Sequence, residues 1–481
     1  MLRQGRRRFA AAAAAAATVV RSPPVLNIPA SALRAVDLKN QELSVSHLPN
    51  GFTVVTEHTP RVNFCTIGVW IDAGSRFETR ENNGVAHFLE HVNFKGSDKF
   101  SKDEIDTTFE YLGSHFNAYT SRDRTAYYIK TFNDHAEQCM ELLADILRNS
   151  KHTPRSVELE RPTILAEMRE VEELVDEVIM DNLHLCAFDS SVSGLPLTIL
   201  GPTDNISKHI DRKMIRDFVD THYTGPRMTL VCSGGLTHRS VERLASTFYG
   251  DLPNANNRPD LVSRYVGGDF VMWNQTMMTA NCAWAVPICG AASPDNIPLQ
   301  LVHCMLGGYR REQQDLFANI THTHNHKFSA RPNLEAIQPF YTPYEETGLF
   351  GMYMVAVPGN DPTDKKLLSE VMHSNFDFLH SLASKPVAAD TLETVKAHYK
   401  AAQLMQMDST TNRAEEIGRQ MIHLKRRVPV MDMLQAVDAV TPADIQRVVK
   451  TYFVGARPTV SMIGHPDAIA GLDELSRKGT R

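Results

Sequence analysis

One segment of the chain recurs 230 positions further along. Residues 212–234 read RKMIRDFVDTHYTGPRMTLVCSG, and residues 442–464 read PADIQRVVKTYFVGARPTVSMIG. At this spacing the copies pair Ile215 with Ile445, Thr221 with Thr451, Gly225 with Gly455, Arg227 with Arg457, Thr229 with Thr459, and Gly234 with Gly464. Each copy predicts a helix, a turn containing glycine and a β-branched strand. The repeat indicates an internal duplication and therefore two homologous domains.

A chain of 481 residues exceeds one ordinary domain, in agreement with the repeat. The polar stretch PNANNRP, at residues 253–259, holds two prolines and is typical of a linker. We therefore expect a first domain over residues 40–252, a linker over 253–265 and a second domain over 266–475.

The pattern of the first half mixes strands with helices. We expect strands over residues 52–57, 64–71, 116–120 and 125–132, and helices over residues 83–94, 137–149 and from 157 to about 188. The strands around the polar turn at 121–124 predict an antiparallel hairpin. The expected fold class is α+β, in which each domain is a mixed, mainly antiparallel sheet packed by helices.

The N-terminus differs in composition from the rest. Residues 1–36 contain six arginines, many alanines and no acidic residue, a pattern typical of a mitochondrial transit peptide. A secretory signal is the alternative, but its apolar run would be mostly alanine. Removal of residues 1–36 would lower the formal net charge from −6 to −12. A protein with this negative charge attracts cationic partners. We expect no nucleic acid as a partner, because nucleic acids are also negatively charged.

Seven scattered cysteines, with no Cys-x-x-Cys pair, argue against a disulfide scaffold and favour a reducing compartment. No run of about 20 apolar residues predicts a transmembrane helix.

The stretch HFLEH at residues 87–91 places two histidines four apart, on one face of a predicted helix. Both imidazoles can therefore bind one metal ion, and a catalytic zinc site needs a third protein ligand. The acidic helix from Leu159 to Asp181 is the best source, because Glu160, Glu167 and Asp181 lie seven and fourteen residues apart, on one predicted face. Any of the three could complete the site, and Pro162 could start or kink that helix.

Glu90 precedes His91 and lies off the axis of the two ligands. A carboxylate there can accept a proton from zinc-bound water and later protonate a leaving amine. The chemistry that this pattern indicates is amide hydrolysis.

HFLEH, followed 76 residues after His91 by Glu167, resembles the inverzincin motif of the pitrilysin-like metallopeptidases. The flanking words resemble the branch of mitochondrial processing-peptidase β subunits: GVAHFLEH from Gly84, FKG from Phe94, NAYTSR from Asn117, ILGPTDN from Ile199 and TGLFG from Thr347. The resemblance covers nearly all of the chain after residue 36. It implies the processing-peptidase/LuxS-like metallohydrolase fold and a location in the mitochondrial matrix.

Carried over by position, the resemblance implies one zinc ion per chain on His87, His91 and Glu167, with Glu90 as general base. Glu160 matches an auxiliary catalytic acid. Glu177 and Asp181 match acids that receive an arginine of the substrate, although carboxylates on an acidic helix often only face solvent. Residues Asn117, Ala118 and Tyr119 match the strand that pairs with an extended substrate, and an ordinary core strand is the alternative.

The same resemblance implies a heterodimer with an α subunit that carries a glycine-rich loop, and basic presequence peptides as substrates. Here Gly307 and Gly308 form only a pair, so the chain resembles the β partner. The second half has no HxxEH, and His303 and Cys304 lack ligand spacing, so that half is expected to be inactive.

We expect a zinc endopeptidase that cleaves presequences from imported proteins. A core subunit of ubiquinol–cytochrome c reductase (respiratory complex III) is the alternative, alone or combined with peptidase activity, and a presequence-degrading peptidase is a third. For His322, His324 and His326 a solvated loop is the favoured interpretation over a metal-binding strand.

Overall fold

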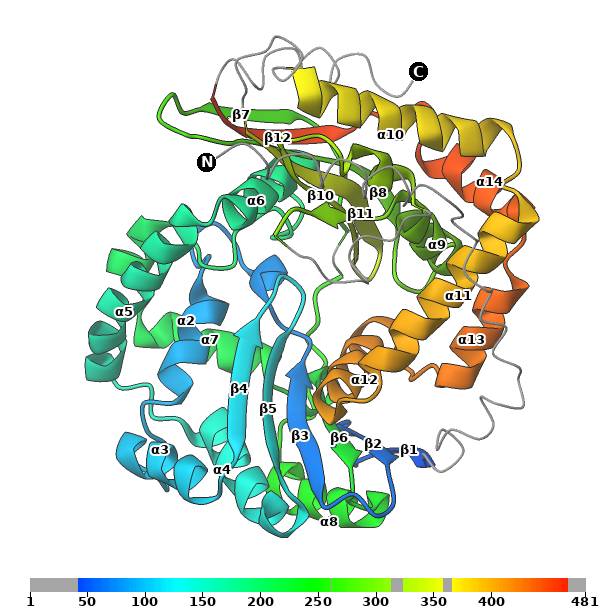
Figure 1. The fold of residues 1–481 in the computed structure, drawn as a ribbon. Coiled ribbons are helices and arrows are strands. Elements are labelled where there is room, and N and C mark those ends of the chain that lie inside the picture. The colour runs from blue at the N-terminus through cyan, green and yellow to red at the C-terminus, as the bar shows by residue number, and fades with distance from the viewer. Residues whose placement is uncertain (1–41, 261, 313–322, 358–365, 466–481) are drawn as a thin grey trace, which may run out of the picture.

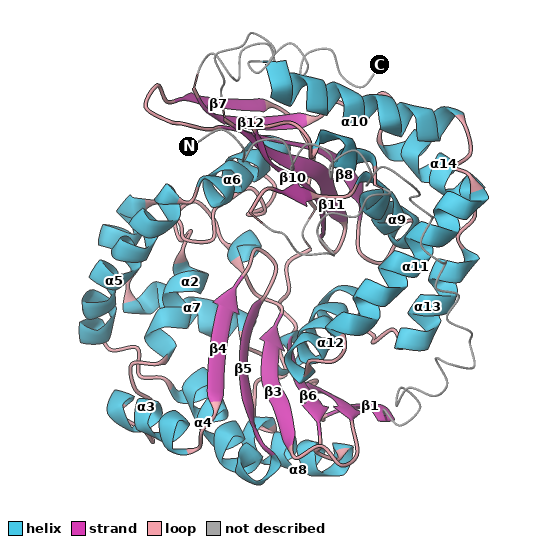
Figure 2. Cartoon of the chain, in the orientation of Figure 1, coloured by secondary structure: helices cyan, strands magenta, loops and turns pink. Residues whose placement is uncertain are grey.

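The computed structural model describes residues 42–260, 262–312, 323–357 and 366–465. The predicted transit peptide lies outside the described residues. Two six-stranded sheets, one from each half of the chain, form the centres of two layered units with helices packed against them (Figures 1 and 2). No helix in these ranges is long and apolar enough to cross a bilayer.

The first sheet has the order β1-β2-β6-β3-β5-β4, and only β2 and β6 are parallel. Its strands are β1 (Glu42–His47), β2 (Thr53–His58), β3 (Phe64–Ile71), β4 (His115–Thr120), β5 (Thr125–Phe132) and β6 (Met228–Gly234). The second sheet has the order β7-β12-β8-β11-β10-β9, and only β7 and β12 are parallel. Its strands are β7 (Asp269–Trp273), β8 (Ala280–Cys289), β9 (Tyr309–Arg310), β10 (Leu334–Pro343), β11 (Thr347–Ala356) and β12 (Thr459–Gly464).

Five strands correspond in order and direction between the sheets: β2-β6-β3-β5-β4 matches β7-β12-β8-β11-β10. The repeated segment is α7 (Arg212–His222) with β6 in the first half and α14 (Pro442–Tyr452) with β12 in the second. The predicted α+β class, with two related mixed sheets, is confirmed. The sheets differ at their ends, because β1 extends one edge of the first sheet and β9 covers the opposite edge of the second.

The remaining helices of the first half are α2 (Val85–Asn93), α3 (Lys102–Tyr111), α4 (Ala136–Asn149), α5 (Pro154–Glu173), α6 (Val175–Ala187) and α8 (His238–Tyr249). Those of the second half are α9 (Asn296–Leu306), α10 (Leu367–Ser384), α11 (Ala389–Gln406), α12 (Thr410–Leu424) and α13 (Val430–Ala439).

The expected single helix from 157 to about 188 is wrong. Leu174 has φ −85° and ψ 96°, an extended conformation that ends α5 and starts α6 in a new direction. Pro162 lies inside α5, which runs on through it, so Glu160 and Glu167 share one helix. Asp181 belongs to α6, and the predicted common face of all three acids is therefore wrong.

One helix of each half packs against the sheet of the other half. Ile179 and Leu183 of α6 are buried against Ala283 and Ala285 of the second sheet. Ile417 of α12 belongs to a buried cluster with residues of the first sheet, among them Val55, Trp70, Ala126 and Val231. Because apolar side chains of each half are buried by the other, the halves are joined by far more than the linker.

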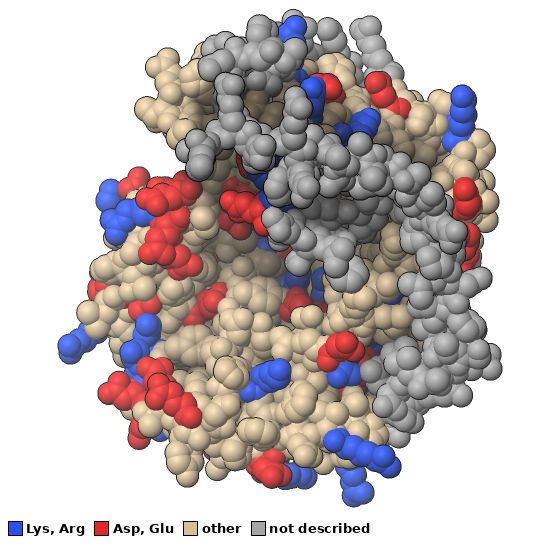
Figure 3. Space-filling view, in the orientation of Figure 1, with Lys and Arg blue, Asp and Glu red and all other residues tan. Residues whose placement is uncertain are grey.

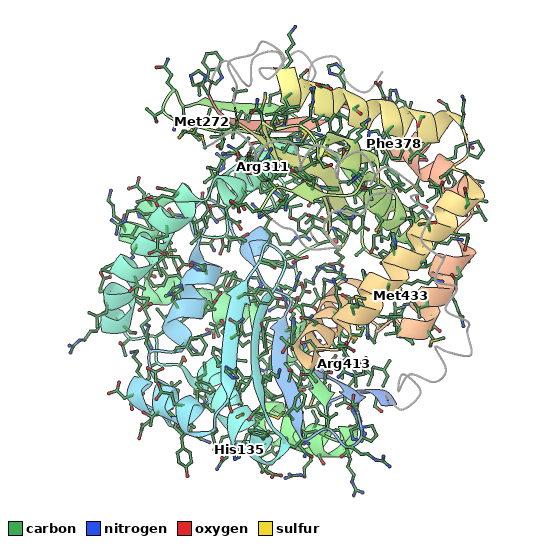
Figure 4. All side chains as sticks on the ribbon, in the orientation of Figure 1. His135, Met272, Arg311, Phe378, Arg413 and Met433 are labelled. Atoms are coloured by element: carbon green, nitrogen blue, oxygen red, sulfur yellow. The ribbon has the colours of Figure 1, made fainter. Side chains whose placement is uncertain are left out.

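Polar contacts accompany this exchange. Arg413, labelled in Figure 4 on α12, donates to the hydroxyl of Thr59 at 3.0 Å and lies 3.8 Å from Glu57. Further along α12, the buried His423 pairs with Asp123 in the turn between β4 and β5. The first sheet is therefore anchored to the second half by charged as well as apolar groups.

Candidate metal centre

Helix α2 carries the two histidines of HFLEH, and its start is fixed by a buried acid. Gly84 precedes the helix with φ 99°, a conformation that favours glycine. The backbone N–H groups of Gly84 and Ala86 donate to Glu78 at 2.9 and 2.7 Å, as does the Asn83 amide at 2.7 Å. Burial raises the pKa of Glu78 to about 7, against the opposing effect of these bonds. Glu78, which no sequence motif singled out, fixes the start of the helix that carries both histidines.

His87 and His91 project from the same face of α2, with ring centroids 4.7 Å apart. Glu167, from α5, lies opposite them. Its two oxygens are 3.5 Å from Nε2 of His87 and 3.0 Å from Nε2 of His91. One ligand atom from each of these three residues lies within 4.8 Å of the others, and no other such group of three occurs among the described residues.

This donor set fits a catalytic zinc ion. Two imidazole nitrogens and one carboxylate oxygen are a common zinc ligand set, which leaves a fourth position for water or substrate. Hydrogen bonds from His87 and His91 hold the pKa of Glu167 well below its usual range, so the carboxylate is ionised. The structure brings together the three residues that the sequence predicted as ligands.

Glu160 lies behind His91 and does not face the ligand cluster. Nδ1 of His91 donates to Glu160 at 3.0 Å, and Lys95 donates to the other oxygen of Glu160 at 2.8 Å. Burial alone would raise the pKa of Glu160, but the bonds from His91 and Lys95 outweigh it and lower the pKa. A carboxylate in this place orients a metal-binding imidazole. Lys95 was not among the predicted site residues, although it lies in the FKG segment that begins at Phe94.

His87 has no equivalent support. Its Nδ1 is buried, and no described residue hydrogen-bonds to it. The ring of His87 therefore has a polar partner on one side only, Glu167 at Nε2, while the ring of His91 has one on each side, Glu160 and Glu167.

Glu90 is half-buried beside the ligands on α2. The hydroxyl of Thr120, at the end of β4, donates to Oε2 of Glu90 at 2.5 Å. This bond fixes the carboxylate and leaves its other oxygen available for a proton. Thr120 was missed, although it follows directly on the three strand residues that the sequence singled out.

Asn117, Ala118 and Tyr119 lie on β4, the edge strand of the first sheet. Within the described ranges β4 pairs only with β5, so its outer backbone edge is open. The corresponding strand of the second sheet, β10, is covered at that edge by β9. Among the described residues, only the first sheet therefore leaves this edge unpaired. The side chains of Asn117 and Tyr119 are engaged within the chain, with the hydroxyl of Tyr128 and with Glu415 respectively.

Glu177 and Asp181 both lie on α6 and differ in their surroundings. Asp181 accepts from the guanidinium of Arg122 at 2.6 Å, so it already has a cationic partner. Glu177 is an exposed residue whose carboxyl group is partly screened from water. This partial desolvation, and then the negative charges of Asp176 and Asp181, raise the pKa of Glu177. Figure 3 shows acidic side chains gathered over the region where α5 meets α6.

The second half holds no matching cluster in its described part. His303 of α9 donates to the carbonyl oxygen of Pro339 at 3.0 Å. Burial lowers the pKa of His303 and raises that of the neighbouring Cys304 thiol to about 11. His324 lies in a short helical turn, 324–328, and stacks on Phe378, which fits neither a strand nor a solvated loop. His322 lies outside the described residues.

Residues 53–202 match the family profile "Insulinase (Peptidase family M16)", and residues 209–399 match the profile "Peptidase M16 inactive domain". The mitochondrial-processing peptidase subunit beta of Rattus norvegicus is 34% identical over 92% of this chain and 88% of its own length. The ubiquinol-cytochrome-c reductase complex core protein I of Euglena gracilis is 40% identical over 83% of each chain.

Among solved structures, a chain of "Complex III2 from Candida albicans, Inz-5 bound" matches with a TM-score of 0.79 at 18% identity. The match covers 91% of this chain and 100% of that one, and at this identity it shows the shared fold alone. Taken with the two profiles and the relatives over most of the sequence, these matches establish that the chain belongs to the M16 (insulinase) family of peptidases.

Proposed function

We propose that this protein is a zinc endopeptidase of mitochondria, the β subunit of a processing peptidase that cleaves presequences from imported proteins. The observation that carries the proposal is the convergence of His87, His91 and Glu167, with Glu90 held beside them by Thr120. A chain kept only as a scaffold has no physical need for a complete ligand set with an aligned carboxylate.

Each residue of the site would have a separate role in peptide hydrolysis. His87, His91 and Glu167 would hold the zinc ion, which when bound supplies Lewis acidity to a water and to the peptide carbonyl. Glu90 takes the proton of the attacking water and returns it to the leaving amine. Thr120 holds Glu90 in the orientation for both transfers, and Glu160 keeps the imidazole of His91 turned toward the metal.

The surroundings suit an extended, basic peptide. The open edge of β4, from Asn117 to Tyr119, offers backbone groups to an added strand, which demands little of the peptide's sequence. Glu177 of α6 is exposed, and among the described residues its carboxylate forms no direct salt bridge, although Arg122 lies near enough to act on its charge. An arginine of the substrate is the natural complement. Asp181 would take part through exchange of its bond with Arg122.

In this proposal residues 1–36 are a transit peptide and residues 40–252 are the catalytic domain. Residues 253–265 are the linker, and residues 266–475 are an inactive homologous domain. The protein acts in the matrix with an α subunit that carries a glycine-rich loop.

A core subunit of respiratory complex III is a second candidate. The relative from Euglena gracilis that bears the core protein I name is 40% identical to this chain, above the 34% of the rat peptidase subunit. One chain could serve both roles, because the metal site occupies only the first half.

The test combines activity with assembly. The chain is co-expressed with a glycine-rich-loop homologue and given a precursor protein, with and without a zinc chelator. One defined cut that is lost with the chelator and restored by zinc supports the peptidase, and many cuts in free peptides indicate a degrading enzyme. Purification from mitochondria identifies the partners: co-migration with respiratory subunits, together with absence of cleavage, leaves only the core role.

A further inference from the structure

Glu415, on α12 of the second half, accepts hydrogen bonds from three side chains of the first half. Nε1 of Trp70 on β3 donates at 2.9 Å, and the hydroxyl of Tyr119 on β4 lies 2.6 and 2.7 Å from the two carboxylate oxygens. The guanidinium of Arg124, in the turn after β4, donates at 3.1 Å and also reaches the Tyr119 hydroxyl at 3.0 Å. We call these contacts of Glu415 with Trp70, Tyr119 and Arg124 the junction. The sequence motifs did not predict it.

The junction lies on the opposite face of β4 from the metal centre. Successive side chains of a strand point to opposite faces of the sheet. Tyr119 points to α12 and Glu415, while the next residue, Thr120, points to α2 and Glu90. The end of β4 is therefore held from both faces, and one peptide unit links the two contacts.

A second contact of α12 fixes the turn that follows. His423 pairs with Asp123, and Asp123 also pairs with Arg124 at 3.0 Å. Although Asp123 is buried, its bonds to His423 and Arg124 hold its pKa well below the usual range, so the turn carries a buried charge matched by α12. The second half thus contacts both the end of β4 and the turn that follows it.

We propose that Glu415 is a positioning residue for the peptidase reaction: it holds the end of β4 through Tyr119, and Thr120 thereby presents its hydroxyl to Glu90. This inference rests on the proposed function. It assigns to the inactive half a part in aligning the general base of the active half, through Tyr119 and Thr120.

The test uses the complex with the glycine-rich-loop subunit and compares Glu415→Gln with wild type. The amide keeps the size of the side chain but presents an NH2 group to donors, so one of the three bonds is lost. We expect kcat to fall about tenfold, with KM within about twofold, since the general base is misaligned and the peptide edge stays open. Glu416→Gln is the matched control, because among the described residues Glu416 accepts hydrogen bonds only from Arg419 and Gln420 of its own helix.

A double-mutant cycle with Thr120→Val separates positioning from general support. If Glu415 acts through Thr120, then Glu415→Gln adds less than about twofold to the loss in kcat that Thr120→Val causes alone. Zinc content and the thermal unfolding midpoint are measured on each variant. Should Glu415→Gln fail to fold, Tyr119→Phe, which removes one hydroxyl and keeps the packed ring, is compared in the same cycle.

Wild-type kcat in Glu415→Gln, a change in KM alone, or losses that add fully in the double variant would each overturn the proposal. Failure of the proposed function gives a different result, since the wild-type complex itself would then leave the precursor uncut.

Discussion

Glu160 supports His91 from the side of the imidazole that faces away from the ligand cluster. Nδ1 of His91 lies 3.0 Å from Oε1 of Glu160, while Nε2 lies 3.0 Å from Glu167. A partner on the far nitrogen fixes the ring and raises its basicity as a ligand, and its loss typically costs 10- to 100-fold in metal affinity.

We therefore predict that Glu160→Gln weakens zinc binding by about 10- to 100-fold while the protein stays folded. Competition with a fluorescent zinc chelator measures the affinity. Glu158→Gln, which removes an exposed acid of the same helix that pairs with Arg161, is the control and should bind zinc as wild type does. Equal affinities for all three proteins would mean that packing alone orients His91.

Removal of the proton acceptor should separate metal binding from catalysis. Glu90→Gln keeps His87, His91 and Glu167, so zinc content should remain at one ion per chain. Precursor cleavage should fall by about 100- to 10,000-fold, the range that a positioned general base contributes. Glu167→Gln is the matched comparison, since it should lose zinc and activity together. Normal cleavage by Glu90→Gln would assign the base to another residue.

Zinc binding should depend on pH through His91. Burial opposes the charge of this imidazole, but its bonds to Glu160 and Glu167 outweigh that effect and raise its pKa from 6.5 to about 9. A raised pKa contributes stability that is present in full below pH 6.5 and is lost as pH rises through 9. The metal-free protein should therefore lose stability across this window, while apparent zinc affinity should increase, because zinc displaces the same proton.

Thermal unfolding of the metal-free protein at a series of pH values, paired with zinc titrations, checks this dependence. His91→Gln supplies the control, because glutamine keeps a hydrogen bond but does not titrate. The same pH slope in that variant would exclude His91 as its source.

Two acids of α6 should differ in substrate recognition. Glu177 is exposed and lies near Asp176 and Asp181, so Glu177→Gln should lower kcat/KM about tenfold for substrates with an arginine near the cut and little for those without one. Asp181→Asn should lower cleavage of both substrates, because it leaves the buried Arg122 without its partner, and should lower it more for the arginine substrate, because the carboxylate that would exchange this bond is gone. Glu110→Gln, in an exposed acid of α3, is the control. Equal losses on both substrates in Glu177→Gln would remove the arginine contact.

Local patterns predicted the two histidines and limited the third ligand to Glu160, Glu167 or Asp181, and the family resemblance then selected Glu167. Residues four apart, such as His87 and His91, share a face of any helix, and the spacing of seven from Glu160 to Glu167 places both acids on one face of α5. Asp181 could not be placed in this way, because the break at Leu174 carries no proline or glycine signal. The contacts of Thr120 with Glu90 and of Tyr119 with Glu415 depend on tertiary packing between segments far apart in the chain, which periodicity does not encode.

The packing of α12 against the first sheet can be tested at Gly418. Gly418 of α12 lies against Trp70, and a Cβ at Gly418 would stand 2.3 Å from Cγ of the indole, which is fully buried and stacked on Tyr128. Replacement of a helical glycine by alanine ordinarily stabilises by about 1 kcal/mol. Here the added methyl must displace the indole and its bond to Glu415, and overpacking of a core costs about 1–3 kcal/mol.

We therefore predict that Gly418→Ala lowers the unfolding midpoint, against its helix propensity. Asn412→Ala, at an exposed position of the same helix, controls for propensity alone and should stay within about 0.5 kcal/mol of wild type. A higher midpoint for Gly418→Ala would show that α12 does not press on the first sheet at Trp70. Because the same helix carries Glu415, that result would also weaken the link between the second half and the general base.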